Sequence, residues 1–400
     1  MKYNLEAPVS SNWIAPVIII GFVILATIVS GTMYRLKIRK RNHYQNVSMI
    51  ISDFEKESFK KQIDRHDFTL LEQIGSGNFG TVHTGKLNGE FENILASQIA
   101  VKTVSGFATE KEISDFLNEI KIMGQLKPNL NTVNMIASCT SELEKQNKLW
   151  LLIEYCAHGD LKAYLSKHRE SLSTDDSNST INNRLLVLWP YDIAKGMQFL
   201  AKNQIMHGDL AARNILICDD PLACNHPLAK VSDFGLSKKF YDNIKYKKET
   251  RLEIPWKWMA LEYFRDDFFT LTSDVWSFAV VVWEILSLGR SPYGLQGYDE
   301  VLEQLENGYR LPCPREAIEI STWQAEDFYK RISNACFESD PLRRADFSQV
   351  VSIIHTEMTG EELIRYNEMQ KNIMIRLIQT IMYTLNLKET NEVVLIVSGG

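Results

Sequence analysis

Residues 14–34 are the feature that most restricts the fold of this chain, because they contain no Asp, Glu, Lys or Arg. A helix needs roughly 20 apolar residues to cross a bilayer, and this segment supplies them. A cleavable signal peptide usually has an apolar part of about 7–15 residues that follows its positive charges. A helix buried in a protein core is rarely apolar on every side. We therefore expect one transmembrane helix at residues 14–34.

Basic residues follow this segment and set its expected orientation. Lys and Arg occupy five of the seven positions from Arg35 to Arg41, with no acid among them. The positive-inside rule places such a cluster in the cytosol, so residues 1–13 are expected outside the cell and the rest of the chain inside, at the plasma membrane. Residues 1–13 are too short for a ligand-binding domain. The cluster begins a juxtamembrane linker, residues 35–67, that is also suited to anionic lipid headgroups.

Composition narrows the function classes. The net charge of −6 argues against a general nucleic-acid-binding protein, which would be basic. All six cysteines lie after residue 34, without a close CxxC spacing. That pattern favours a reduced compartment and predicts no disulfide framework.

The periodicity of the chain changes along its length. From Phe68 the sequence has short β-rich runs with glycine turns, which predicts strands that include residues 148–156. Helical apolar spacing marks residues 110–126, and the later part is mainly helical, most clearly at residues 188–203 and 273–289. Strands first and helices afterwards predict an α+β enzyme with two lobes. Residues 169–183 read as a polar insertion.

Two early features are typical of phosphate binding. "GSGNFG", from Gly75 to Gly80, is followed by a strand rather than by the helix of a dinucleotide fold, so its backbone amides are expected to cover phosphates. Lys102 lies at the end of the next long strand, and Glu119 lies on the inward face of the 110–126 helix. A buried acid needs a cation, so we expect the two side chains to pair. An exposed lysine at a strand end is the plainer alternative.

Two later features complete a phosphoryl-transfer pattern. In "IMHGDLAARNIL", Asp209 is placed to accept a hydroxyl proton, and Asn214 to bind a metal. In "VSDFGLS", Asp233 stands at a turn where its carboxylate is available to the same ion. One Asp, one Asn and a nucleotide suit Mg²⁺, which prefers one or two carboxylates plus phosphate oxygens.

From about Phe68 to Ile354 the chain resembles the receptor tyrosine kinases, because the glycine loop, "AVK", the helix glutamate, "HGDLAARN" and "DFG" occur in the family's order. Serine/threonine kinases usually carry a lysine where this chain has Ala211. "DLAARN", with Arg213, looks like the receptor tyrosine kinase form. "IPWKWMALEYF" is similar to the tyrosine kinases' substrate-side segment, where Pro255 and Trp258 shape a shelf for the phenol side chain.

This resemblance implies a protein kinase domain over residues 68–357, with a β-rich N-lobe (68–155), a helical C-lobe (156–357) and a C-terminal tail (358–400). It implies ATP and Mg²⁺ as nucleotide and metal ion, and protein tyrosines as substrates. The catalytic positions it implies are Asp209, Lys102, Glu119, Arg213 and Asn214. Those for the nucleotide and its metal ion are Ile74, Gly75, Ser76, Gly77, Gly80, Val82, Ala100, Lys102, Ile153, Glu154, Cys156, Leu216 and Asp233, with Asn214 and Asp233 as the metal ligands.

Three departures from the family pattern stand out, and one of them is a long turn after "NILI", "CDDPLACNHPLAK", which looks like a surface insertion. Gly208 replaces the arginine of "HRD", which normally pairs with a phosphorylated activation-loop residue. "APE" reads "ALE" and "RPTF" reads "RADF", yet Glu262 and Arg344 remain as a predicted buried ion pair. By resemblance Tyr246, and also Tyr241, are candidate autophosphorylation positions.

Gly208 also supports an alternative from another class, a pseudokinase scaffold that binds ATP or partners and transfers nothing. With either function, Tyr366 and Tyr383 of the tail are candidates to recruit SH2- or PTB-type phosphotyrosine readers. Dimerisation stays an open hypothesis, because residues 14–34 lack GxxxG and offer only Ala26 and Ser30 as a small-xxx-small pair.

Overall fold

The computed structural model places the chain in two units, residues 1–58 and 59–400. It describes residues 31–35, 62–77, 80–88, 98–104, 108–141, 148–170, 184–219, 227–239, 246–247, 255–266, 268–320 and 324–384. In the first unit only residues 31–35 are described, and they are helical. Within the described ranges, no helix has both the length and the apolar composition needed to cross a membrane. Residues 14–30 of the predicted transmembrane helix, the segment 1–13 and most of the 35–67 linker lie outside those ranges.

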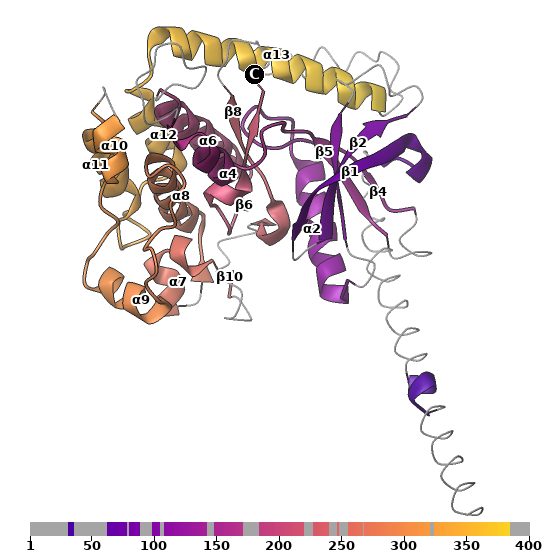
Figure 1. The fold of residues 1–400 in the computed structure, drawn as a ribbon, viewed down its shortest axis with the longest axis horizontal. Helices are drawn as coiled ribbons and strands as arrows, with labels where there is room; N and C mark the ends of the chain where they lie inside the picture. The colour runs from indigo at the N-terminus through magenta and orange to yellow at the C-terminus, as the bar shows by residue number, and fades with distance from the viewer. Residues whose placement is uncertain are drawn as a thin grey trace, which may run out of the picture. The chain divides into compact units, whose positions relative to one another are not determined.

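The N-lobe is built on a five-stranded antiparallel sheet in the order β1-β2-β3-β5-β4 (Figure 1). Its strands are β1 (Phe68–Gly77), β2 (Gly80–Leu87), β3 (Ile99–Thr103), β4 (Met135–Cys139) and β5 (Trp150–Glu154). Phe68, Val101, Trp150 and Leu152 pack together in its core. The predicted 148–156 strand is confirmed as β5.

Helix α2 (Glu110–Gln125) belongs to the same lobe and confirms the predicted 110–126 helix. Thr109 begins it: its side chain accepts from the backbone N–H of Glu112, and the Glu112 carboxylate accepts from the backbone N–H of Thr109. This reciprocal cap satisfies donors that a helix N-terminus otherwise leaves unpaired. The buried face of α2 carries Phe116 and Ile120 but also Glu119.

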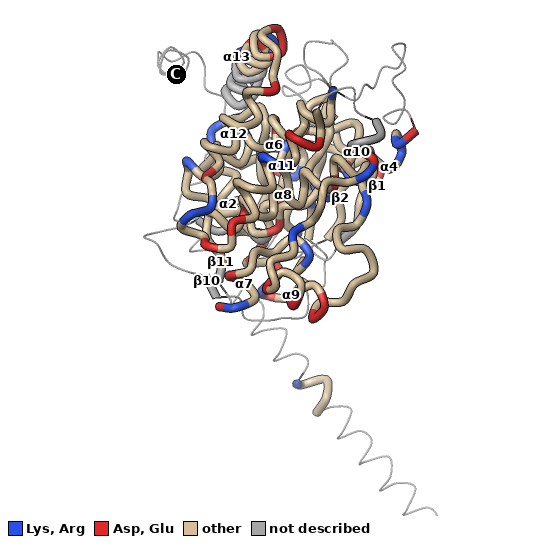
Figure 2. The backbone as a smooth tube through the Cα atoms, turned by 90° about the vertical axis from the view of Figure 1, so that its left-hand side faces the viewer, with Lys and Arg blue, Asp and Glu red and all other residues tan. Residues whose placement is uncertain are grey.

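The C-lobe is mainly helical, as the sequence predicts (Figure 1). Its helices are α4 (Leu161–Lys167), α6 (Leu185–Lys202), α7 (Leu261–Asp266), α8 (Leu271–Leu286), α9 (Tyr298–Glu306), α10 (Arg315–Ile320), α11 (Ala325–Cys336), α12 (Phe347–His355) and α13 (Gly360–Thr384). Helices α6 and α8 confirm the two clearest helical predictions. They carry Trp189 and Trp276, which are both fully buried. On the face in Figure 2, acidic and basic residues are interspersed rather than gathered by sign.

Short strands and turns connect the helices of the C-lobe to the junction between the lobes. They are β6 (Ile205–Met206), β7 (Ile215–Cys218), β8 (Leu228–Val231), β9 (Lys238–Lys239), β10 (Tyr246–Lys247) and β11 (Phe268–Phe269), with the 3-10 turns η3 (Ala212–Asn214), η4 (Phe234–Leu236) and η5 (Trp256–Trp258). A further 3-10 turn, η1 (Arg65–Asp67), directly precedes β1. The strands pair as β6–β9, β7–β8 and β10–β11.

The predicted ion pair between Glu262 and Arg344 is present. Arg344 Nη1 and Nη2 donate to the two carboxylate oxygens of Glu262 at 2.7 and 2.8 Å, and both side chains are buried. Ser273 also donates to Glu262, and Arg344 to the backbone oxygens of Glu338 and Thr272. The pair joins the segment that precedes α8 to the segment that precedes α12.

One expectation about the tail is wrong. Tyr366 does not stand free to recruit a phosphotyrosine reader, because it lies on α13 with only 4% of its surface exposed. The first part of α13 packs against the C-lobe, where Glu362 pairs with Arg184. The side chain of Tyr383 lies outside the described part of the structure.

Candidate active site

Lys102 and Glu119 form an ion pair between β3 and α2. Lys102 Nζ donates to both carboxylate oxygens of Glu119, each at 2.8 Å. The same nitrogen lies 3.1 Å from Oδ1 of Asp233, which follows β8. One ammonium group therefore gathers two carboxylates from distant parts of the chain.

Lys102 and Asp233 stabilise each other's charges, whereas burial raises the pKa of Glu119. Burial alone would lower the pKa of Lys102, but the charges of Glu119 and Asp233 raise it above its ordinary value. Burial alone would raise the pKa of Asp233, but the charge and hydrogen bond of Lys102 outweigh burial and hold that pKa below its ordinary value. Lys102 is therefore a cation and Asp233 an anion at neutral pH.

The loop between β6 and β7 orients Asp209. Asn214 Nδ2 donates to the backbone oxygen of Asp209 at 2.7 Å and to its carboxylate Oδ2 at 2.9 Å. Arg213 donates to the other carboxylate oxygen, and its guanidinium carbon lies 4.6 Å from the ring centroid of Trp258. The carboxylate of Asp209 is thus held from two sides.

Ser232 connects this loop to Asp233. Its backbone nitrogen donates to the backbone oxygen of Asn214 at 2.9 Å, and its hydroxyl donates to the same oxygen at 2.8 Å. His207 Nε2 lies 2.9 Å from the backbone oxygen of Ser232. The structure therefore brings Lys102, Asp209, Asn214 and Asp233 into one connected group.

Gly208 has a backbone reason for being glycine. Its φ of 76° lies in the left-handed region, which glycine reaches without the steric penalty of a side chain. Its N–H donates to Asp274 Oδ1 at 3.0 Å, and the N–H of His207 donates to Oδ2 at 2.7 Å. The buried carboxylate of Asp274 thus fixes the turn before Asp209.

The glycine-rich segment forms the β1–β2 hairpin, as predicted. Gly75 is opposite Val82, Ser76 opposite Thr81 and Gly77 opposite Gly80, while residues 78 and 79 lie outside the described ranges. Gly80 has a φ of 136°, and a Cβ added there would lie 1.9 Å from the backbone oxygen of Thr103. Only glycine fits that approach of β2 to β3. Ile74 lies on β1 and is half exposed.

Ile153 and Glu154 end β5 and Cys156 follows it, so these predicted nucleotide positions lie in one segment, the hinge (residues 153–156). Ile153 pairs with Ala100 across the sheet, and the isolated bridge between Asp160 and Leu216 joins the segment after the hinge to β7. The Glu154 carboxylate accepts from Lys230 Nζ at 2.9 Å on each oxygen. The sequence contained no signal for this contact, because Lys230 reads as an ordinary strand residue.

The absence of a disulfide framework was predicted wrongly, because Cys156 and Cys218 form a disulfide. The two residues are 62 positions apart, and packing of the hinge on β7 brings their Cα atoms to 4.3 Å. Cysteine spacing along a chain carries no information about such a contact.

Glu284 is a site residue that the sequence reasoning missed. It is buried in α8, and its Oε2 accepts from the backbone N–H of Ala212 and from Trp258 Nε1, both at 2.9 Å. Burial raises the pKa of Glu284 to about 7. The sequence signal that could have identified Glu284 was its place in the nearly apolar stretch "SDVWSFAVVVWEIL".

The candidate autophosphorylation positions are only partly described. Tyr246 lies on β10, opposite Phe269 of β11, and nothing is described of its side chain. Tyr241 lies outside the described ranges, as does most of the predicted 169–183 insertion.

Comparison with known proteins agrees with this geometry. The family model for protein tyrosine and serine/threonine kinases matches residues 68–354. This chain belongs to that protein kinase family. The match covers the segment in which the kinase motifs occur, and the predicted bilobal kinase fold is confirmed.

Several similar curated proteins are receptor tyrosine kinases. The fibroblast growth factor receptor of Ciona intestinalis is 36% identical over 320 residues, which cover 76% of this chain and 40% of that protein. The tyrosine kinase receptor Cad96Ca of Drosophila melanogaster is 31% identical over 312 residues, or 76% of this chain and 38% of that receptor. The fibroblast growth factor receptor of Hydra vulgaris is 29% identical over 354 residues, or 86% and 41%. The chain thus spans about two fifths of these relatives, and the prediction of a tyrosine kinase domain is confirmed.

Proposed function

We propose that this protein is a membrane-anchored protein tyrosine kinase, which transfers the γ-phosphoryl group of ATP to tyrosine hydroxyls of proteins in transmembrane signalling. The observation that carries the proposal is the connected group of Lys102, Glu119, Asp209, Asn214 and Asp233. Phosphoryl transfer needs little covalent help, so positioning and charge neutralisation account for most of the catalysis.

Each member of the group has a role in this proposal. Asp209 accepts the proton of the substrate hydroxyl, and Arg213 keeps its carboxylate oriented. Lys102, held by Glu119, binds the α- and β-phosphates.

The Asp233 carboxylate and the Asn214 amide oxygen are hard oxygen ligands, which is the donor type that Mg²⁺ requires. The lowered pKa of Asp233 keeps it anionic for that purpose. When bound, Mg²⁺ would neutralise charge on the phosphates.

The β1–β2 hairpin and the hinge complete the proposed nucleotide site. Gly75, Gly77 and Gly80 cover the phosphates with backbone amides. Backbone groups of Glu154 and Cys156 bind adenine, and Ile153 limits the rear of the site. The remaining proposed contacts are Ile74, Ser76, Val82, Ala100 and Leu216.

The cellular setting is part of the same proposal. Residues 14–34 anchor the chain in the plasma membrane, with residues 1–13 outside and the kinase domain in the cytosol, supported by the apolar run and the basic cluster after it. Protein tyrosines are the substrates, and phosphotyrosine readers, anionic lipids and a second copy of the chain are the proposed partners.

Phosphorylation of a glutamate–tyrosine copolymer by the full chain with ATP and Mg²⁺ tests this function. Asp209→Asn is expected to lower kcat at least a hundredfold. The matched control is Asp219→Asn, because the side chain of Asp219 is 75% exposed and contacts His158 rather than a member of this group. A wild-type chain that binds ATP but transfers no phosphate would instead establish the pseudokinase scaffold, to which Gly208 lends its support.

A further inference from the structure

The C-terminal helix α13 contacts both lobes of the kinase domain. Near the start of α13, Glu362 forms a bidentate ion pair with Arg184, which precedes α6. Arg184 Nε lies 2.6 Å from Oε1 of Glu362, and its Nη2 lies 2.7 Å from Oε2. Farther along, α13 contacts β4 of the N-lobe sheet. Figure 1 shows the helix running along one side of both lobes. An element that contacts both lobes restricts their relative movement.

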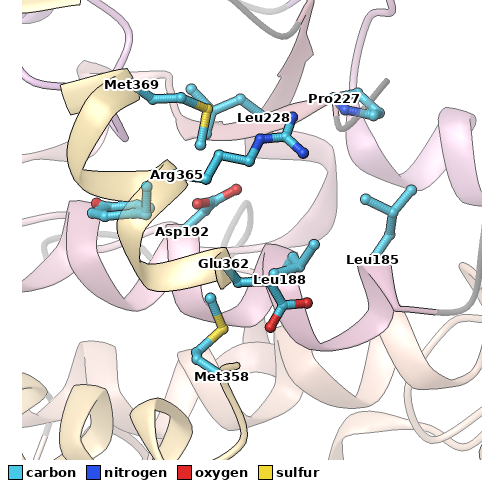
Figure 3. A pocket seen from close by; sticks show the side chains of 10 residues that line it. Leu185, Leu188, Asp192, Pro227, Leu228, Met358, Glu362, Arg365 and Met369 are labelled. Atoms are coloured by element: carbon cyan, nitrogen blue, oxygen red, sulfur yellow. The ribbon is translucent and has the colours of Figure 1, made fainter. Parts of the chain in front are cut away.

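Tyr366 is the buried centre of this contact. Its hydroxyl donates to Oδ1 of Asn131, a residue 235 positions earlier, and its ring packs edge-on against Tyr191 with centroids 5.2 Å apart. Burial and the nearby charge of Asp192 raise the pKa of Tyr366, so its hydroxyl is protonated and able to donate. In Figure 3, Glu362 and Met369 project from α13 toward α6 and Leu228.

Asn131 lies in the segment 126–134, which connects α2 to β4. Its Nδ2 donates to Asp192 Oδ1 at 3.2 Å, and its backbone oxygen accepts from Val231 N–H at 2.9 Å. The N–H of Val133 donates back to the oxygen of Val231 at 2.8 Å. A Cβ on Gly196 would lie only 2.4 Å from the oxygen of Asn131, so this segment is packed tightly on α6.

These contacts link the tail to the candidate active site. The segment 126–134 directly follows the helix that carries Glu119, and it is hydrogen-bonded to β8 two residues before Asp233. Glu119 and Asp233 are the two acids that bind Lys102. The positions of Glu119 and Asp233 therefore depend on the contact between Tyr366 and Asn131.

We propose that α13 is a positioning strap and Tyr366 its positioning residue: docked through Asn131, the helix holds the α2–β4 connection against β8 and so keeps Glu119 and Asp233 at Lys102. The proposal rests on the proposed kinase function. Small displacements of positioned groups are costly in catalysis, so release of the strap lowers the rate of phosphoryl transfer.

Tyr366→Glu in the full chain tests the strap, because it places a carboxylate in a buried site beside Asp192. The matched control is Ile364→Glu, which adds the same charge to the exposed face of the same helix, where Ile364 is 62% exposed. For Tyr366→Glu we expect kcat to fall at least tenfold, with less than a threefold change in the KM for ATP, because the hinge is not displaced. For Ile364→Glu we expect both constants within twofold of wild type.

Hydrogen exchange at the amides of Val133 and Val231 supplies a readout that does not depend on activity. Tyr366→Phe removes only the hydroxyl and should speed exchange there about fivefold, as expected from the loss of one hydrogen bond. Unchanged exchange in Tyr366→Phe would overturn the proposal even if Tyr366→Glu does not fold. So would a Tyr366→Glu protein that keeps the kcat of Ile364→Glu. A wild-type chain without kinase activity refutes the proposed function, whereas the exchange result still decides whether the strap exists.

Discussion

Arg344→Met should be among the most destabilising substitutions in this protein. It removes the guanidinium from a pair in which both side chains are at most 4% exposed. The carboxylate of Glu262 would then stay buried, with the hydroxyl of Ser273 still donating to it. Breaking a buried pair by removing one partner costs about 3–5 kcal/mol, because an uncompensated charge is left behind. That is a large share of the roughly 5–15 kcal/mol that holds a domain folded.

Urea denaturation of the full chain, followed by tryptophan fluorescence, measures this cost. The matched control is Lys330→Met, which breaks an exposed pair with Glu326 whose atoms lie 2.9 Å apart. An exposed pair contributes far less than a buried one, because water screens its charges. The double variant Glu262→Gln/Arg344→Met should regain stability relative to Arg344→Met, because it removes the orphaned charge. The reasoning is refuted if Arg344→Met and Lys330→Met cost the same, or if the double variant is the less stable one.

Three further predictions concern the site. The pKa of Glu284, raised from 4.5 to about 7, means that the folded state loses stability as pH rises from about 4.5 to about 7. Glu284→Gln should remove about 3 kcal/mol of that decline. Denaturation curves would contradict this if the free energy of unfolding changed equally between pH 5 and pH 8 in the variant and in the wild type. Gly80→Ala should weaken ATP binding at least tenfold in calorimetry by displacing β2, whereas Gly360→Ala, with nothing within 4 Å of its added Cβ, should not. Peptide mapping without reductant should recover Cys156 and Cys218 in one linked peptide pair, and alkylation of both thiols before reduction would exclude the disulfide.

Several contacts could be predicted from the sequence because they follow from residue type and local periodicity. Glu119 falls on the apolar face of α2, and a buried acid there requires a cation such as Lys102. The pair of Glu262 and Arg344 was instead predicted from the resemblance to the kinase family, through the "ALE" and "RADF" motifs. The glycines of the β1–β2 hairpin were predicted because a strand, not a helix, follows them.

Other features depend on which surfaces pack against each other, and the periodicity of the sequence does not predict those pairings. The helical pattern of α13 predicts an apolar face, but the identity of its partner is settled only when Tyr366 reaches Asn131. The disulfide of Cys156 and Cys218 likewise arises from packing of the hinge on β7.

The sequence by itself therefore determined the order of the elements, the lobes and the chemical groups of the site, because these follow from local residue spacing and side-chain type. Only the tertiary structure decided that the tail helix packs on the kinase domain, because a contact across 235 positions forms through the burial of two surfaces that the local sequence does not pair.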